Sequence, residues 1–218
     1  MSNYEKPDYW SLKARKEGYP ARSVYKLQEL DERFGLFRQV SGTGGTPLKR
    51  GPASALRVLD LGAAPGSWSL YALRRMRQQG FLVAVDLSPL SRQYDQGLFG
   101  GENFRFIQGD ITEGAIRETI LAQAPFSLVL SDAAPATTGN SSVDTLRSLA
   151  LAETALEYAA TALIPGGSLV VKVFQGGDTP GLLTRIRELF KTGKGFKPTA
   201  CRSESFEIYY LGICRTNP

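Results

Sequence analysis

The chain has 218 residues, of which 42% are hydrophobic, so it is long enough to bury one substantial core, and it has neither repeats nor a linker that would separate two domains. It has no histidine, and its two cysteines, Cys201 and Cys214, form no CxxC pair, which argues against a zinc site and removes the usual proton acceptor near neutral pH. The amino terminus lacks a signal peptide and no apolar run approaches 18 residues, so we expect a cytoplasmic protein with no membrane segment and no metal.

The net charge of +5 comes entirely from the amino-terminal quarter. Residues 1–57 hold 11 Lys/Arg against 6 Asp/Glu, whereas the two signs balance in the rest of the chain. Such clustering indicates either a polyanionic partner or a solvated basic face, and charge alone does not decide between them. We expect a basic helical extension over 1–40, with a helix around 21–34, and a flexible Gly/Ser/Pro-rich loop over 41–55 to which no function is assigned.

The remaining core, residues 56–213, alternates strand and helix patterns. Apolar runs bounded by turn residues predict strands over 56–61, 81–86, 104–108, 127–132, 168–174 and 206–213. Helical periodicity lies between them, over 67–79, 112–123, 143–164 and 180–191. This alternation predicts an α/β fold with a doubly wound, Rossmann-like parallel sheet.

Carboxylates stand at the ends of the first four strands. Asp60 lies in the last turn of the first strand, and Asp86, Asp110 and Asp132 close or follow the next three. A single Asp in such a place is most often an N-cap or a turn former. In an open parallel sheet, however, ligands bind outside the carboxyl ends of the strands, so four carboxylates in register indicate a binding site there.

The first turn, "LDLGAAPGSW", has glycines at 62 and 66. It therefore fails the GxGxxG pattern of dinucleotide-binding folds, and the chain has no GxxxxGK[ST] phosphate loop. Two glycines could also serve only close backbone packing. An adenosyl ligand with a positive charge tolerates a ring of carboxylates, and this favours S-adenosyl-L-methionine, with Asp86 placed to accept hydrogen bonds from ribose hydroxyls.

Lys172 interrupts the apolar strand "SLVVKVF". Buried parallel strands are nearly continuous apolar runs, so an ammonium there needs a reason. The lysine is either a snorkelling side chain at a strand end or a functional group.

Taken together, these segments resemble the FtsJ-type ribose 2′-O-methyltransferases of RNA. The resemblance runs from about Tyr9 to Gly212, through "GYPARSVYKLQELDERF", "VLDLGAAPGSWS", "VAVDLSP", "SDAAPATTGNSSVD", "PGGSLVVKVFQG" and "SFEIYYLG". It implies a methyltransferase sheet that is mostly parallel with an antiparallel carboxyl-terminal strand. It also implies a single RNA-binding enzyme domain, expected to be a monomer, whose substrate is most simply 23S ribosomal RNA of the large subunit.

The resemblance also implies the site residues. The family uses a Lys-Asp-Lys-Glu tetrad, which falls on Lys26, Asp132, Lys172 and Glu207. The predicted cofactor-binding residues are Gly62, Gly66, Ser67, Trp68, Asp86, Asp110 and Asp132.

The chain departs from the family in two places. The glycine-rich stretch before the first strand is long, and Phe206 stands where an arginine often precedes the glutamate. Both departures concern substrate binding more than chemistry, so a tRNA or another RNA is an alternative target. A base N-methyltransferase and a non-catalytic ribosome-assembly factor are further alternatives, although "DAAPATTG" has no aromatic residue to stack on a flipped base.

Two mechanisms follow for the tetrad. A ribose hydroxyl is a poor nucleophile and needs a group that takes or shares its proton. Burial disfavours an ammonium on Lys172, whereas Asp132 favours it. Lys172 is therefore either a neutral base or a cation that stabilises the developing alkoxide, with Lys26 adding positive potential and Glu207 orienting the pair.

The basic extension would then hold RNA. We expect phosphate contacts from one group of basic residues: Lys13, Arg15, Lys16, Arg22 and, on the opposite lip, Arg202. By contrast, "RRMR" at 74–77 lies on the first crossover helix and is expected to be a solvated face.

Overall fold

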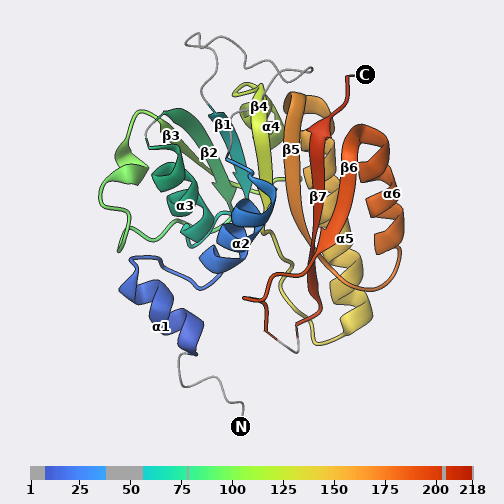
Figure 1. The fold of residues 1–218 in the computed structure, drawn as a ribbon, viewed down its shortest axis with the longest axis horizontal. Coiled ribbons are helices and arrows are strands. Elements are labelled where there is room, and N and C mark those ends of the chain that lie inside the picture. Colours follow the sequence, from blue (N-terminus) through green and yellow to red (C-terminus); the bar gives the residue numbers. More distant parts are fainter. Residues whose placement is uncertain (1–7, 38–55, 78, 203–204, 218) are drawn as a thin grey trace.

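The protein is described by a computed structural model that covers residues 8–37, 56–77, 79–202 and 205–217. The predicted loop over 41–55 and the first residues of the extension lie outside these ranges. The centre of the fold is a seven-stranded sheet in the order β3-β2-β1-β4-β5-β7-β6 (Figure 1). Neighbouring strands from β3 to β5 run parallel, and β7 is antiparallel to both β5 and β6.

The strands follow the apolar runs of the sequence. The parallel part comprises β1 (Leu56–Leu61), β2 (Gly80–Asp86), β3 (Phe104–Gln108), β4 (Phe126–Ser131) and β5 (Leu163–Phe174). The antiparallel part comprises β6 (Phe190–Phe196) and β7 (Glu207–Arg215). The strand order reverses between β1 and β4, and in such sheets this switch point is where ligands bind.

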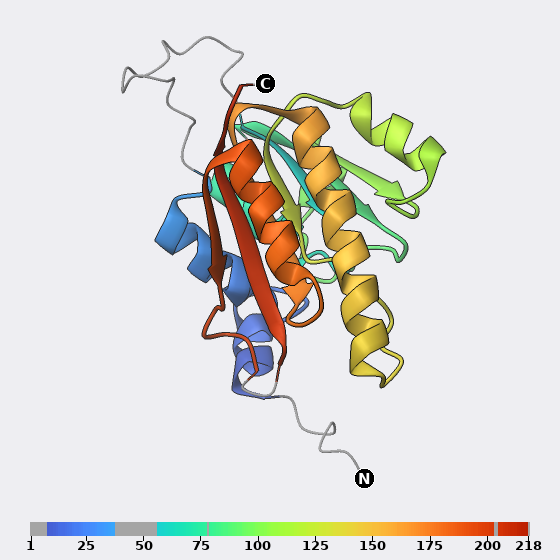
Figure 2. The ribbon, with the colours of Figure 1, turned by 90° about the vertical axis from the view of Figure 1, so that its right-hand side faces the viewer.

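Helices cover both faces of the sheet (Figure 2). The first apolar core packs α4 (Gly114–Leu121), α5 (Ser141–Ala162) and α6 (Thr179–Leu189) on one face. The second packs α2 (Val24–Phe34) and α3 (Ser67–Met76) on the other face. A short helix, α1 (Tyr9–Lys16), precedes α2, and a 3₁₀ turn, η2 (Leu98–Gly100), precedes β3.

The predicted doubly wound sheet is confirmed, and the carboxyl-terminal strand is antiparallel as expected. The sequence did not predict β6, and the helix expected over 180–191 runs into it. The segment "FKTGKGF" has two glycines and two lysines in seven residues, so it lacks the apolar pattern of a buried strand. This segment is an edge strand that pairs only with β7, so it does not need the apolar side chains of a strand that lies between two others.

Within the described ranges, no helix combines the length and the apolar character that crossing a bilayer requires.

Candidate active site

Lys172 extends from β5, two residues before the end of that strand, into a buried polar cluster. It lies on β5 directly opposite Tyr209 of β7. Its Nζ donates to the main-chain oxygen of Asp132 at 2.6 Å and lies 3.0 Å from the Asp132 carboxylate. Because Lys172 is only 5% exposed, these contacts take the place of water around the amine.

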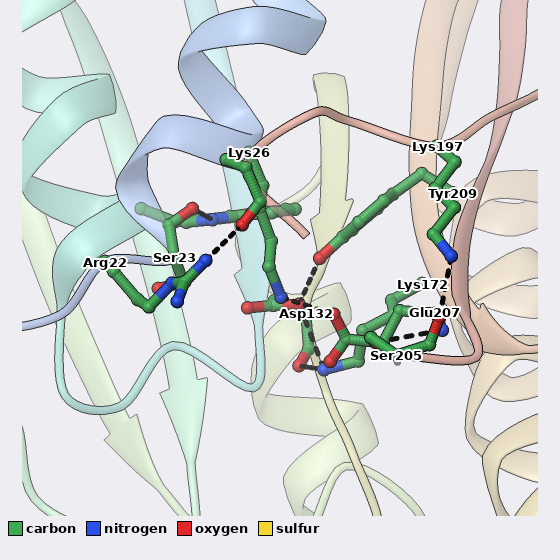
Figure 3. A network of polar contacts seen from close by, with 11 residues as sticks. Arg22, Ser23, Lys26, Asp132, Lys172, Lys197, Ser205, Glu207 and Tyr209 are labelled. Atoms are coloured by element: carbon green, nitrogen blue, oxygen red, sulfur yellow. Dashed lines mark hydrogen bonds and ion pairs between the residues drawn. The ribbon is translucent and has the colours of Figure 1, made fainter. Parts of the chain in front are cut away.

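Lys26 and Glu207 form a second ion pair beside the first. Lys26 comes from α2 and Glu207 from the start of β7, and the Lys26 Nζ donates to Glu207 Oε2 at 2.6 Å. Figure 3 shows both pairs converging on Asp132 at the end of β4. Four residues that are far apart in the sequence therefore meet at one end of the strands, and their role in catalysis stays a prediction.

The charges of the tetrad support one another. Burial alone would raise the pKa of Asp132, but the nearby amino groups of Lys172 and Lys26 and the Tyr209 hydroxyl hold it below its ordinary value. Burial would likewise lower the pKa of Lys26, yet Asp132 and Glu207 raise it overall. Near neutral pH, Asp132 is thus a carboxylate and Lys26 an ammonium.

Tyr209 belongs to this cluster although the sequence analysis did not single it out. Its hydroxyl donates to Asp132 Oδ1 at 2.7 Å, and its ring is fully buried. Burial and the nearby Asp132 raise its pKa far above the ordinary value, so it remains a hydrogen-bond donor. The signal was present, because Tyr209 stands two residues after Glu207 and so faces the same side of β7.

The start of α3 fixes the position of α2, and therefore of Lys26. Ser67 Oγ donates to the main-chain oxygen of Ala21 and accepts from its amide, and Trp68 Nε1 donates to the oxygen of Ser23. The side chains of Ser67 and Trp68 therefore anchor the segment that leads into α2. Cofactor contacts predicted for Ser67 and Trp68 would have to come from their main-chain amides, which belong to the open first turn of a helix.

Gly62 and Gly66 shape the turn between β1 and α3. Their φ angles are +74° and +108°, in the region that favours glycine. A Cβ on Gly62 would lie 2.4 Å from the main chain of Ala133, and one on Gly66 would lie 2.8 Å from the Phe99 ring. The two glycines therefore permit close approach of the chain.

Asp86 and Asp110 stand at the carboxyl ends of β2 and β3. Asp86 accepts from the amides of Ala64 and Ser88 at 2.9 and 2.8 Å. Asp110 accepts from the amide and hydroxyl of Thr112, both through Oδ1. Both carboxylates are partly exposed at the same end of the strands as the tetrad, where they can accept hydrogen bonds from a polar ligand.

Asp60 is a fully buried carboxyl beneath this turn. Its Oδ2 accepts from Ser69 Oγ at 2.7 Å, and its Oδ1 has no partner among the described residues. Burial raises the pKa of Asp60 to about 7, the charges of Asp132 and Asp86 add to this, and the Ser69 hydrogen bond opposes it. Near neutral pH Asp60 is therefore partly protonated, unlike Asp132.

The residues predicted to bind RNA differ in their surroundings. Arg15 and Lys16 on α1 are exposed, as is Arg202. Lys13 instead lies over the rings of Trp10 and Tyr25. Arg22 is largely buried, pairs with Asp8 and donates to the main-chain oxygen of Ala200. A role of these residues in RNA binding stays a prediction.

The expectation of a solvated face for "RRMR" was wrong for Arg74, which is partly buried, whereas Arg75 and Arg77 are exposed. Arg74 donates to the main-chain oxygens of Gly18 and Tyr94, and its guanidinium lies over the Tyr19 ring. Arg75 pairs with the buried carboxylate of Asp31 at 2.8 Å. These arginines hold the extension against α3, a role that periodicity cannot reveal because the partners are distant in the sequence.

The strand order and the clustered tetrad at the switch point define the class of Rossmann-like S-adenosylmethionine-dependent methyltransferases. Comparison with known families narrows the class, because the FtsJ-like methyltransferase model matches residues 19–215. The chain belongs to this family.

Relatives with assigned names cover almost the whole chain. It is 48% identical over 213 residues to ribosomal RNA large subunit methyltransferase E of Treponema denticola, covering 97% of this chain and 96% of that protein. The protein of the same name from Borreliella afzelii is 44% identical over 205 residues, covering 94% and 96%. A crystal structure named as a ribosomal RNA methyltransferase from Plasmodium falciparum has a similar fold, with a TM-score of 0.70, 24% identity and coverage of 92% of this chain and all of that one.

The cofactor is S-adenosylmethionine, and the residues at the sheet edge fit it. The carboxylates of Asp86 and Asp110 can accept hydrogen bonds from an adenosyl group. Asp60 Oδ1 is a buried acceptor without a partner among the described residues. The side chains that fit the cofactor are acidic hydrogen-bond acceptors, which suits a ligand that carries positive charge.

Proposed function

We propose that the protein transfers a methyl group from S-adenosylmethionine to a ribose 2′-hydroxyl of RNA, and that its substrate is ribosomal RNA of the large subunit. The observation that carries the reaction is the convergence of Lys26, Asp132, Lys172 and Glu207, two lysine and two acidic side chains paired at 2.6 and 3.0 Å. The named function of the relatives supports the choice of RNA.

The tetrad provides what a ribose hydroxyl needs. Bound S-adenosylmethionine supplies a methyl group activated by a sulfonium. Transfer of this methyl group to the hydroxyl oxygen would break the carbon–sulfur bond, and the electron pair of that bond would remain on sulfur. Lys172 takes the hydroxyl proton if it is neutral, or stabilises the developing negative charge if it is an ammonium, in which case the proton passes to water.

The other members of the tetrad position Lys172. Asp132 holds the amine through two contacts, and an ammonium has three N–H bonds, so the third is available for a substrate oxygen. The Lys26–Glu207 pair adds an oriented ammonium next to the same point. Holding hydroxyl, methyl and sulfur in line contributes up to about 7–11 kcal/mol in favourable systems.

The test is transfer of a tritiated methyl group to RNA. Large-subunit particles and free RNA from a strain that lacks the protein are incubated with it and labelled S-adenosylmethionine, and the RNA is digested to nucleosides. We expect label on the 2′-oxygen of a single nucleoside. Label on a base would support a base methyltransferase instead, and the absence of label on both substrates would support a non-catalytic factor.

Two variants separate chemistry from cofactor binding in this assay. Lys172→Ala should reduce transfer by at least a hundredfold with nearly unchanged cofactor affinity, because it removes a proton acceptor or cation and leaves every predicted cofactor-binding side chain, Asp132 included, in place. Asp86→Ala should first weaken cofactor binding, measured by calorimetry. Equal loss of cofactor affinity in both variants would contradict this division of roles.

A monomeric state, action in the cytoplasm and a place of the substrate RNA within the large ribosomal subunit stay predictions, and the sequence does not decide between free RNA and the assembled particle. The same assay compares the two forms of the substrate directly.

A further inference from the structure

A cavity of about 710 Å³ opens beside the tetrad. Its walls come from four segments at one edge of the sheet: the loop after β4, the first turns of α5, the loop after β5 and the residues just before β7. The lining residues are Thr137, Gly139, Ser141, Ser142, Asp144, Thr145, Leu146, Phe174, Gln175, Gly176, Gly177, Ser205, Phe206 and Glu207. The volume lies within the range of ligand-binding pockets, about 300–1,000 Å³.

The cavity is continuous with the proposed site of methyl transfer. Glu207 both lines it and accepts the hydrogen bond from Lys26. Across the sheet, Phe174, another lining residue, is paired in register with Glu207 and lies two residues after Lys172. A ribose held at the tetrad would therefore have its base within reach of this cavity.

Two large apolar side chains of the lining are exposed, Phe206 at 68% and Leu146 at 63%. Phe206 belongs to the segment before β7 and Leu146 belongs to α5, so two separate elements contribute apolar surface to the cavity. An exposed aromatic ring beside a polar site is a typical platform for stacking an unpaired base.

The segment that carries Phe206 is held by its backbone. The amide of Gln175 donates to the Phe206 oxygen at 2.8 Å, and the amide of Glu207 donates to Ser205 Oγ at 3.2 Å. Lys197 Nζ donates to the Ser205 oxygen at 2.8 Å, as Figure 3 shows. The ring is therefore exposed but its main chain is fixed, so stacking on it costs little ordering of the loop.

The charge of the lining points to a base and not to a phosphate. Among the described residues that line the cavity, the charged ones are Asp144 and Glu207, and both are acidic. A phosphate would be repelled here, whereas an uncharged base can stack on Phe206 and donate N–H groups to hydroxyls and carboxylates at the rim.

We propose that this cavity receives the base of the nucleotide whose ribose is methylated, and that Phe206 stacks on that base. This inference rests on the proposed function and adds the part of the site that selects the nucleotide. It assigns a role to the residue that stands where relatives of this type often carry an arginine.

Three substitutions of Phe206 form a matched series. Phe206→Tyr keeps the ring, Phe206→Leu keeps apolar volume without a flat face, and Phe206→Ala removes both. Methyl transfer is measured with the RNA substrate that wild-type protein labels, and cofactor affinity and melting temperature are measured alongside. We expect kcat/KM for RNA to fall about tenfold or more in the Leu and Ala variants and to stay within about threefold of wild type in the Tyr variant, because stacking requires the ring. Cofactor affinity should be equal in all of them.

Leu146→Ser on α5, the other exposed apolar residue of the lining, provides a second, independent variant and should also lower kcat/KM for RNA. If the Leu and Ala variants methylate RNA as well as wild type does, the inference is wrong while the proposed function stands. If wild-type protein labels no ribose, the proposed function fails and the inference fails with it.

Discussion

Asp132 is the central residue of the site, because Lys172, Lys26 and Tyr209 all act to lower the pKa of its carboxyl group. It is largely buried, receives one hydrogen bond on its main-chain oxygen from Lys172 and one on its carboxylate from Tyr209, and lies near the amino groups of Lys172 and Lys26. A carboxylate in this setting depends on each donor, since a buried charge that loses a partner is not compensated by water.

Replacement of Tyr209 by Phe should therefore change how activity depends on pH. Without the hydroxyl, Asp132 loses a partner that helps to hold its pKa down, so the carboxylate becomes protonated at a higher pH. A hydrogen bond to a charged group is worth about 1.5–3 kcal/mol, and each pKa unit corresponds to about 1.4 kcal/mol. We expect the acidic limb of kcat/KM to move upward by about one pH unit.

Tyr210→Phe is the matched control for this substitution. Tyr210 is the next residue and is also buried, but its side chain packs in the core on the other face of the sheet. Its loss should leave the acidic limb in place. An acidic limb that moves equally in both variants, or in neither, would show that Tyr209 does not act on Asp132.

Asp60 gives a prediction about stability and pH in the cofactor-free protein. Its pKa is about 7 in the folded state and about 4 in the unfolded chain, so the folded state binds more protons between these values. The free energy of unfolding should therefore fall as pH rises from 4 to 7 and then stay level, because ionising Asp60 costs more in the fold than in water.

Asp60→Asn removes this titration while keeping an acceptor for Ser69. Between pH 5 and pH 8 the wild type should lose about 2–3 kcal/mol relative to the variant, measured by urea unfolding. Parallel curves for the two proteins would mean that Asp60 does not titrate in this range.

Among the secondary-structure elements, α2 has the most demanding position, because it brings Lys26 to the strand ends from outside the sheet. It is joined to α3 by Ser67, Trp68 and the buried carboxylate of Asp31, which accepts from Tyr71 and Arg75. A further acceptor oxygen of Asp31 binds the amide of Phe37. The junction between α2 and α3 is therefore polar at its centre and depends on being fully paired.

Arg75→Ala should loosen this junction. Asp31 is 3% exposed and would lose its cation, but Arg75 itself is about half exposed, so we expect a loss of about 1 kcal/mol and not the full cost of a buried pair. Amide hydrogen exchange in α2 should accelerate while exchange in β7 is unchanged. Arg77→Ala, at an exposed position of the same segment, is the control and should change neither. Equal exchange in α2 for the two variants would contradict the role of Arg75.

At the same scale, the sequence predicted the strands that are apolar and missed the one that is not. Runs such as "LRVLDL" and "SLVLSD" identify β1 and β4 because both faces of a central strand are buried. The β6 segment, at the edge, pairs only with β7 and carries glycines and lysines. The contacts of Arg74 and the pairing of Arg75 with Asp31 were not predicted for a related reason, since helical periodicity describes one helix and not what lies against it.

The tetrad could be predicted only as a set. Lys172 was visible as a charge within an apolar strand, and Asp132 as a carboxylate at a strand end, but Lys26 and Glu207 were ordinary residues until the resemblance joined them. Tyr209 required the register of β7 against β5, and the Phe206 cavity required the arrangement of four segments. Contacts between segments distant in the sequence leave no local pattern, so these features could not be predicted from the sequence.

For the whole molecule, the excess of five positive charges belongs to residues 1–57. Within this quarter, α1 carries three basic residues, Lys13, Arg15 and Lys16, and no acidic one. Not every positive charge there is available to RNA. Arg22 joins Asp8 to Ala200, and Lys13 lies on two aromatic rings, so both have structural contacts within the protein. The exposed pair on α1, Arg15 and Lys16, is the better candidate for phosphate contacts.

The dependence of RNA affinity on salt tests this assignment. Each phosphate contact releases counterions, so removal of two contacts should reduce the slope of log affinity against log salt by about 1.5–2. We expect this change for the double variant Arg15→Ala/Lys16→Ala, with little change in melting temperature. The control Lys191→Ala/Lys194→Ala removes the same charge from exposed positions on the edge strand β6, away from α1, and should keep the wild-type slope. If both double variants lower the slope equally, net charge attracts the RNA and α1 is not a specific contact surface.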